Sequence, residues 1–179
     1  MRIIGRLNIG GPAINTILLS AKLDKDRFEP LLVTGMIDKC EGDMSYLAKE
    51  SGIYPIIVPQ LGRRLNLYND AVALWKLFFL IRKECPDIVH THTAKAGTLG
   101  RLSAVIFNLT HRKRIKIVHT FHGHVLSGYF NKPFSKFFLT IERVLSSFTD
   151  VIIAVSGAVR KDILSFDIGS QEKVKVVRL

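Results

Sequence analysis

Short runs of apolar, β-branched residues alternate with longer helical patterns along the whole 179-residue chain. Apolar residues in the longer segments recur at intervals of three and four, which is typical of helices that bury one face. Strands that alternate with helices are joined by right-handed crossovers. We therefore expect a Rossmann-like, doubly wound, mostly parallel sheet with helices on both faces. The expected strands cover residues 2–7, 30–34, 53–58, 87–91, 116–121, 151–155 and 174–177.

Local signals refine this expectation. The run Val151–Val155 is apolar throughout, as in a strand covered on both faces. Pro55 cannot donate a ladder hydrogen bond and places its strand toward a sheet edge. Asn69 or Asp70 is expected to cap a long helix that Pro86 stops, and Ser156 to cap the helix after Val155.

The helix that follows Gly10-Gly11-Pro12 carries one apolar stripe. Its members share the i, i+3, i+4, i+7 spacing of a single helix face. They are Ile14, Ile17, Leu18 and Ala21. We expect this stripe to pack against the sheet.

The charge of the chain is strongly positive. It contains 26 Lys and Arg against 15 Asp and Glu, for a net charge of +11. Residues 1–90 contribute +2 and residues 91–179 contribute +9. Such an excess points to a phosphate, a nucleic acid or an anionic lipid surface, or to a merely solvated basic face. No basic module interleaved with aromatic residues is evident, so we expect no nucleic-acid partner.

The sequence shows neither a secretory signal nor a spanning segment. Its densest apolar run, Leu77–Ile81, is far shorter than the roughly 20 residues that cross a bilayer. With two cysteines, a disulfide framework is not expected either. We expect a soluble, cytoplasmic protein.

A peripheral membrane contact is a further expectation. The segment Pro133–Phe148 combines many phenylalanines with Lys132, Lys136 and Arg143, a combination suited to an anionic membrane or, equally, to core packing. Arg63-Arg64 and residues 112–114 could add to a membrane-facing patch.

Two loops carry residues suited to binding. Gly10 and Gly11 follow the first strand and begin a helix, where free N–H groups suit a phosphate, although a simple tight turn is the alternative. The pattern lacks the third glycine of a nicotinamide-cofactor fingerprint. His122 sits at the expected carboxyl end of a strand, where a neutral imidazole suits a sugar hydroxyl or general-base chemistry.

The remaining histidines allow a less favoured zinc interpretation. His90 and His92 would lie on one side of a strand, and His119, His122 and His124 follow later in the chain. No cysteine or carboxylate joins them at a recognisable spacing, so we expect no metal. His90 and His119 are interpreted as buried, hydrogen-bonded strand residues.

Several motifs in order resemble the N-terminal domain of family 4 retaining glycosyltransferases, which have the two-domain GT-B fold. The resemblance covers essentially the whole chain. Its motifs are Arg6-Leu7-Asn8-Ile9-Gly10-Gly11-Pro12-Ala13, Glu41-Gly42-Asp43, Leu61-Gly62-Arg63, the segment from His90 to Arg101, the segment from His119 to His124, and Ile153-Ala154-Val155-Ser156.

The resemblance implies transfer of a sugar from a nucleotide-diphosphate sugar to an acceptor hydroxyl with retention, without an essential metal or other cofactor. It places Gly10 and Gly11 by the donor diphosphate and His122, as the catalytic residue, beside the transferred sugar. It also implies an acceptor site, formed by Glu41, Asp43, Arg63, Lys95 and Arg101. The acceptor would be a glycan or a lipid-linked glycan precursor.

The resemblance also implies that residues 1–179 form a single acceptor-binding domain without the C-terminal donor-binding domain. The chain alone is then expected to be inactive. Gly157 departs from the glutamate that relatives commonly carry at this position. Two alternatives stay open: a nucleotide-sugar 2-epimerase on the same scaffold, and a non-catalytic module that binds sugar or phosphate.

Overall fold

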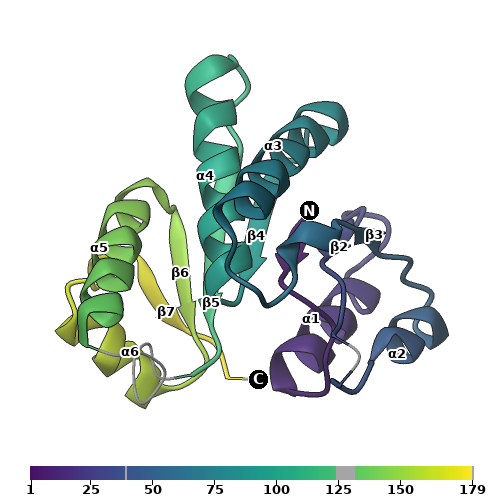
Figure 1. Cartoon of the computed structure of the whole chain (residues 1–179), viewed down its shortest axis with the longest axis horizontal. Coiled ribbons are helices and arrows are strands. Elements are labelled where there is room, and N and C mark those ends of the chain that lie inside the picture. The colour runs from purple at the N-terminus through teal and green to yellow at the C-terminus, as the bar shows by residue number, and fades with distance from the viewer. Residues whose placement is uncertain (39, 124–131, 179) are drawn as a thin grey trace.

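A parallel sheet runs through the middle of the molecule (Figure 1). The computed structural model describes residues 1–38, 40–123 and 132–178, and within these ranges the sheet has seven strands in the order β3-β2-β1-β4-β5-β6-β7. The strands are β1 (Arg2–Ile4), β2 (Leu32–Thr34), β3 (Ile56–Ile57), β4 (Ile88–His92), β5 (Lys116–Phe121), β6 (Val151–Ala154) and β7 (Val174–Val176). Every neighbouring pair is parallel, which confirms the expected doubly wound sheet.

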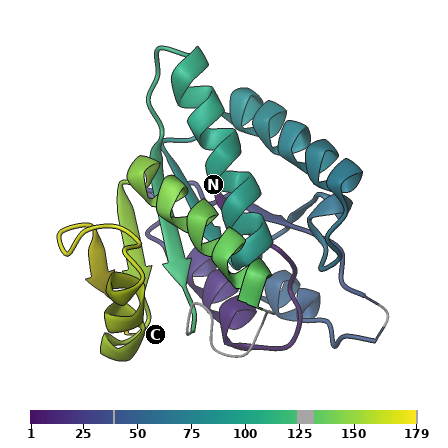
Figure 2. The same ribbon diagram turned by 60° about the vertical axis from the view of Figure 1, so that its left-hand side comes forward.

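Helices cover both faces of this sheet. They are α1 (Gly11–Ala21), α2 (Ser45–Glu50), the 3-10 turn η1 (Pro59–Leu61), α3 (Leu67–Glu84), α4 (Ala94–Thr110), α5 (Lys132–Phe148) and α6 (Gly157–Ser165). Strand residues alternate between the faces, so Ile4 packs with α1 and α2 whereas Ile3 packs with α3 and α4. α6 packs on the α3 and α4 face, and α5 runs beside α4 (Figure 2).

The strand boundaries follow local hydrogen bonding. β1 ends at Ile4, three residues before its expected end, and the N–H of the next residue, Gly5, donates to Thr93 Oγ1 at 3.2 Å. β3 pairs with β2 at the edge of the sheet, which confirms the inference from Pro55. β4 extends through His92, one residue beyond its expected end.

The buried face of α1 differs from the predicted stripe. The buried residues are Ala13, Thr16, Ile17 and Ser20, whereas Ile14 is exposed. The hydroxyls of Thr16 and Ser20 donate to helix carbonyls four residues earlier, at 2.7 and 2.8 Å. Because these hydroxyls are hydrogen-bonded, the polar side chains can be buried at little cost, which an apolar pattern alone does not reveal.

The helix caps agree only in part with the prediction. α3 begins earlier than expected, because the side chain of Asn66 accepts the Asn69 N–H at 2.9 Å. At α6 the expected cap is confirmed, since Ser156 Oγ accepts the Val159 N–H at 3.2 Å. Among the described helices, none combines the length and the apolar character needed to cross a membrane.

Candidate active site

The residues singled out from the sequence gather at one edge of the sheet. Because all strands run parallel, the segments that follow their carboxyl ends emerge at the same edge, where open α/β sheets bind ligands. The Gly10-Gly11 turn follows β1, and His122 directly follows β5. Only β4 lies between these two strands.

The glycine turn has a conformation that requires glycine at one position. Gly10 has φ 158° and ψ 162°, a region that residues with a Cβ rarely adopt. It is the N-cap of α1, and no side chain caps the helix there. The first N–H groups of α1 are therefore left without a side-chain acceptor, which suits an anionic ligand.

The loop that carries Glu41 and Asp43 lies against this turn. Ile9 N donates to Gly42 O at 3.1 Å, and Asn8 and Asp43 form an antiparallel bridge. Asp43 Oδ1 accepts the Ser45 N–H at 2.7 Å. The structure thus brings the predicted donor-phosphate loop and part of the predicted acceptor loop together.

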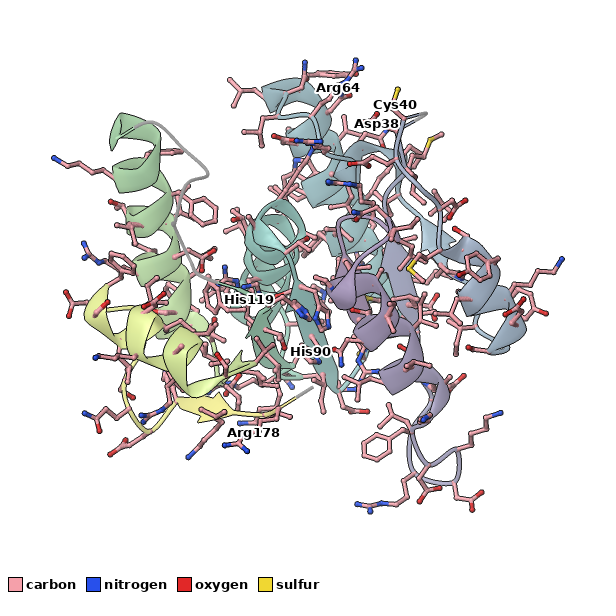
Figure 3. The ribbon with its side chains drawn as sticks, turned by 90° about the horizontal axis from the view of Figure 1, so that it is seen from below. Asp38, Cys40, Arg64, His90, His119 and Arg178 are labelled. Atoms are coloured by element: carbon pink, nitrogen blue, oxygen red, sulfur yellow. The ribbon has the colours of Figure 1, made fainter. Side chains whose placement is uncertain are left out.

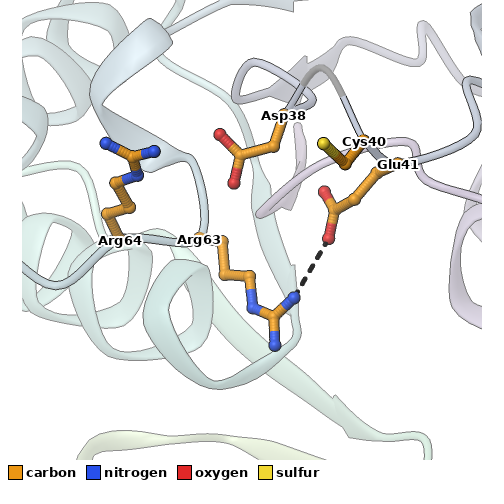
Figure 4. Close-up of a pocket in the computed structure, with 5 residues that line it drawn as sticks. All are labelled: Asp38, Cys40, Glu41, Arg63 and Arg64. Carbon is orange, nitrogen blue, oxygen red and sulfur yellow. Dashed lines mark ion pairs between the residues drawn. The ribbon is translucent and has the colours of Figure 1, made fainter.

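A pocket of about 710 Å³ opens beside this loop and combines basic and acidic groups (Figure 4). Its lining residues are Asp38, Cys40, Glu41, Arg63 and Arg64. Glu41 pairs with Arg6 at 2.7 Å and with Arg63 at 3.6 Å. Glu41 therefore pairs with two guanidinium groups, of which that of Arg63 lines the pocket and can be approached by an anionic ligand. The pairing of Glu41 with Arg6 was not predicted from the sequence.

Lys95 lies near this pocket, but its ammonium group is already paired within the protein. It lies in the first turn of α4, where its Nζ pairs with Asp70 Oδ1 at 2.6 Å and donates to Arg64 O at 2.7 Å. Its side chain is only 11% exposed. Lys95 thereby links the start of α3 and the Arg64 backbone to α4.

Arg101 is placed differently from what the resemblance implied. Its side chain has no exposed surface, and its Nη2 donates to both oxygens of Glu142 on α5, at 2.6 and 2.7 Å. Its Nε donates to Gly97 O at 2.9 Å. A guanidinium held inside the protein cannot touch an acceptor, so Arg101 is not carried forward as an acceptor ligand.

Three histidines form a row on the α1 side of the sheet. The rings of His90 and His92 have centroids 4.3 Å apart, and the rings of His92 and His122 have centroids 5.1 Å apart. His92 Nδ1 and His122 Nε2 share a hydrogen bond of 2.9 Å, and His90 Nε2 bonds Thr120 Oγ1 at 2.7 Å. The expectation that His90 and His92 share one side of the strand is confirmed.

Burial keeps these imidazoles neutral. It lowers the pKa of His122 to about 4 and, together with the charge of Arg2, that of His90 to about 3. Burial is also the main reason that the pKa of His92 lies well below its ordinary value. At neutral pH, His122 is therefore an uncharged group that can donate at one nitrogen and accept at the other.

His119 lies on the opposite face of the sheet. It is buried, its Nδ1 bonds Thr91 Oγ1 at 2.8 Å, and its ring packs against Gly97 of α4. Its predicted role as a buried, hydrogen-bonded strand residue is confirmed. For His90 the hydrogen bond is confirmed, but the residue is only half-buried. Figure 3 shows both residues in the middle of the molecule, away from Asp38, Cys40 and Arg64.

No group of three or more His, Cys, Asp or Glu side chains is placed to bind a metal ion in the part of the chain that the structure describes. His124, which the zinc interpretation also used, lies outside the described residues.

Thr93 is a strained residue that sequence patterns did not reveal. It has φ 65° and ψ 159°, which is costly for a β-branched residue. Its Oγ1 accepts the Gly5 N–H, so Thr93 ties the end of β1 to the start of α4. Strain of this kind concentrates at functional sites.

Comparisons with known proteins add to this geometry. The model of Glycosyltransferase Family 4 matches residues 9–178. An Escherichia coli relative, UDP-Gal:alpha-D-GlcNAc-diphosphoundecaprenol alpha-1,3-galactosyltransferase, is 37% identical over 90 residues, which are 45% of this chain and 22% of the relative. The capsular polysaccharide biosynthesis glycosyltransferase CapM of Staphylococcus aureus is 30% identical over 123 residues, which are 68% of this chain and 30% of the relative.

A solved glycosyltransferase from Rickettsia africae has the same fold. It superposes with a TM-score of 0.67 at 16% identity and covers 99% of this chain, which corresponds to 42% of the solved chain. The present chain thus spans less than half of the relatives it matches.

Proposed function

Because the chain belongs to glycosyltransferase family 4, we propose that it is the acceptor-binding half of an enzyme that transfers a sugar from a nucleotide-diphosphate sugar to an acceptor hydroxyl with retention. The observation that carries this proposal is the shared edge of the sheet, where the Gly10 turn and a neutral His122 follow strands separated only by β4. The pocket beside the Gly10 turn, whose lining includes Arg63 and Arg64, supports an anionic acceptor. The donor site is then shared with a second domain, and residues 1–179 alone do not turn over substrate.

Each group has a chemical role in this proposal. The uncapped start of α1 offers N–H groups and the positive end of a helix dipole to the donor diphosphate. His122 hydrogen-bonds the transferred sugar and orients its anomeric carbon. Arg63, held by Glu41, faces the acceptor, and Asp43 supports the loop between the two ligands.

The acceptor is proposed to be a lipid-linked glycan precursor. The name of the E. coli relative gives a sugar on a diphosphoundecaprenol lipid as its acceptor. A diphosphate group matches the exposed guanidinium of Arg63 beside the pocket, since arginine pairs well with phosphate oxygens.

A lipid-linked acceptor also explains an exposed segment that runs from the end of η1 into the first turn of α3, residues 63–68, which we call the connector. Directly after Arg63 and Arg64, it exposes Leu65, Leu67 and Tyr68, which are 70%, 91% and 78% exposed. Apolar side chains flanked by arginines suit the surface of an anionic membrane. We place the peripheral membrane contact here, at the inner face of the cell membrane, because this connector adjoins the proposed acceptor pocket.

The test uses the full-length enzyme that contains this chain, with radiolabelled nucleotide sugars and lipid-linked acceptors. His122→Ala is expected to reduce turnover at least a hundredfold, since one positioned hydrogen-bond donor at the reacting group contributes about that much. Its circular dichroism should match that of the wild type. His111→Ala, which alters a histidine at the far end of α4, serves as the matched control. Near-normal turnover of His122→Ala would remove His122 from the mechanism.

The products separate the proposal from its alternatives. A glycosylated acceptor supports the transferase, whereas a free epimerised sugar nucleotide indicates a 2-epimerase. Binding of the sugar nucleotide without any product from the full-length protein indicates a non-catalytic module.

A further inference from the structure

We propose that His92 sets the tautomer of His122, so that His122 presents a Nδ1–H donor to its ligand. His92 is a positioning residue in this proposal, which rests on the proposed function for its catalytic meaning. The ligand atom that His122 recognises is then an oxygen with a free lone pair, such as a sugar hydroxyl oxygen.

The two rings share one proton between facing nitrogens. His92 Nδ1 and His122 Nε2 are 2.9 Å apart, and both imidazoles are neutral at pH 7, so one nitrogen must donate and the other accept. Two tautomeric arrangements satisfy this bond. In the first, His92 donates from Nδ1; in the second, His122 donates from Nε2.

The other nitrogen of His92 decides between the two arrangements. His92 Nε2 is buried, and no described residue hydrogen-bonds it. If His122 donated, His92 Nδ1 would be the acceptor and its Nε2 would carry a buried N–H without a partner. If His92 donates, Nε2 carries only a lone pair. Because buried N–H groups without an acceptor are rarer than acceptors without a donor, the first arrangement is favoured.

This arrangement determines which nitrogen of His122 carries the proton. With Nε2 accepting from His92, the proton of the neutral His122 ring must be on Nδ1. No described residue hydrogen-bonds this nitrogen, so the Nδ1–H remains for a ligand. A general base at Nδ1 would need a lone pair there, so this tautomer makes His122 a hydrogen-bond donor rather than a base.

His90 strengthens this arrangement from the other side. Its ring packs against His92 and bonds Thr120 Oγ1 through Nε2. Among the described residues, no hydrogen bond joins it to His92, whose Nδ1 bonds His122 and whose Nε2 has no partner. Within the row of three histidines, the hydrogen bond from His92 is therefore the one that acts on the ligand-binding imidazole of His122.

The experiment is two-dimensional NMR on uniformly 15N,13C-labelled protein, in which long-range couplings identify the protonated nitrogen of each imidazole. The wild type is expected to show His122 as the Nδ1–H tautomer at pH 7. In His92→Leu, the His122 population should shift toward Nε2–H, because His122 Nε2 no longer accepts a hydrogen bond from residue 92. His92→Asn should restore Nδ1–H, because the asparagine amide can donate from near the position of Nδ1.

His90→Gln is the matched control. A glutamine amide reaches the position of the His90 Nε2 and can keep the bond to Thr120, so the His122 tautomer should stay as in the wild type. The Nε2–H form of His122 in the wild type would overturn the proposal, even if no variant folds. Persistence of Nδ1–H in His92→Leu would overturn it as well.

Steady-state kinetics of the full-length enzyme separate this inference from the proposed function. In the full-length enzyme, His92→Leu should lower kcat more than tenfold with little change in the donor KM, and His92→Asn should recover most of it. If NMR shows the expected tautomers but no glycosyl transfer is found, the proposed function fails while the tautomer assignment stands.

Discussion

Arg101 on α4 donates from one nitrogen to both carboxylate oxygens of Glu142 on α5, and neither side chain has any exposed surface. The two residues are 41 positions apart in the sequence, and their pairing joins two helices. A buried charge is tolerated only when it is paired and hydrogen-bonded. The pair therefore holds α5 against α4.

The first prediction concerns this pair. Arg101→Ala should lower the free energy of unfolding by about 3–5 kcal/mol, because Glu142 would be left buried and unpaired. The double variant Arg101→Met, Glu142→Leu should lose much less, since apolar residues of similar volume remove both charges. Urea denaturation measures both variants.

Arg63→Ala is the matched control for Arg101. Its guanidinium is exposed, so we expect a change within about 1 kcal/mol. If Arg101→Ala left stability unchanged and instead weakened acceptor binding, the residue would belong to the acceptor site as the family resemblance implied.

The second prediction concerns the packing of α4 on β5. A Cβ on Gly97 would lie 2.5 Å from Cε1 of the His119 ring, which is buried. Gly97→Ala should therefore destabilise the protein by about 1–3 kcal/mol, because the ring or the helix must shift. Thermal unfolding measures the change.

Gly157→Ala is the corresponding control. A Cβ there meets nothing within 4 Å, and Gly157 begins α6. We expect stability to stay equal or to rise by about 0.5 kcal/mol, through the reduced entropy of the unfolded chain. Equal losses in both variants would mean that contact with His119 is not the cause.

Much of the fold could be predicted because local patterns determine it. Strand–helix alternation specifies right-handed crossovers between parallel strands. Pro55 indicates that β3 lies at the edge of the sheet, and Ser156 indicates the start of α6. The inner face of α1 could not be predicted from apolar spacing, since Thr16 and Ser20 are buried through hydrogen bonds to their own helix.

The candidate site was predictable only as a set of loops at one edge. Parallel strands bring together the ends of β1, β4 and β5, so Gly10 and His122 could be expected there. Partners far apart in sequence leave no local signal. Nothing around Arg101 indicates Glu142, and nothing around Arg6 indicates its pairing with Glu41. The backbone strain at Thr93 likewise arises only from tertiary structure.

The third prediction concerns pH. The folded pKa values of His90 and His122, about 3 and about 4, lie below the ordinary value of 6.5. At pH values between the folded and the ordinary pKa of these histidines, the unfolded chain binds more protons than the folded one. The free energy of unfolding therefore falls as the pH falls. The stabilisation is fully present above about pH 6.5 and is lost progressively toward pH 4 and below.

His90→Gln isolates one titrating group. Measured by urea denaturation between pH 7 and pH 5, its pH dependence should be shallower than that of the wild type by up to about 1.4 kcal/mol per pH unit. Above pH 7.5 the two slopes should coincide, because the imidazole is neutral in both states. Identical slopes between pH 7 and pH 5 would show that the pKa of His90 is the same in the folded and unfolded protein.

The last prediction concerns the membrane. If the connector 63–68 contacts an anionic surface, the protein should co-sediment with vesicles of phosphatidylglycerol more than with vesicles of phosphatidylcholine. The difference should shrink at high salt. Leu65→Ser with Leu67→Ser should weaken binding at least tenfold, since burying a leucine side chain contributes about 1.5–3 kcal/mol. Phe137→Ser is the control on α5, where an exposed phenylalanine lies near Lys136. Loss of binding only in Phe137→Ser would move the contact to α5, and equal sedimentation with both lipids would remove the membrane contact from the proposed function.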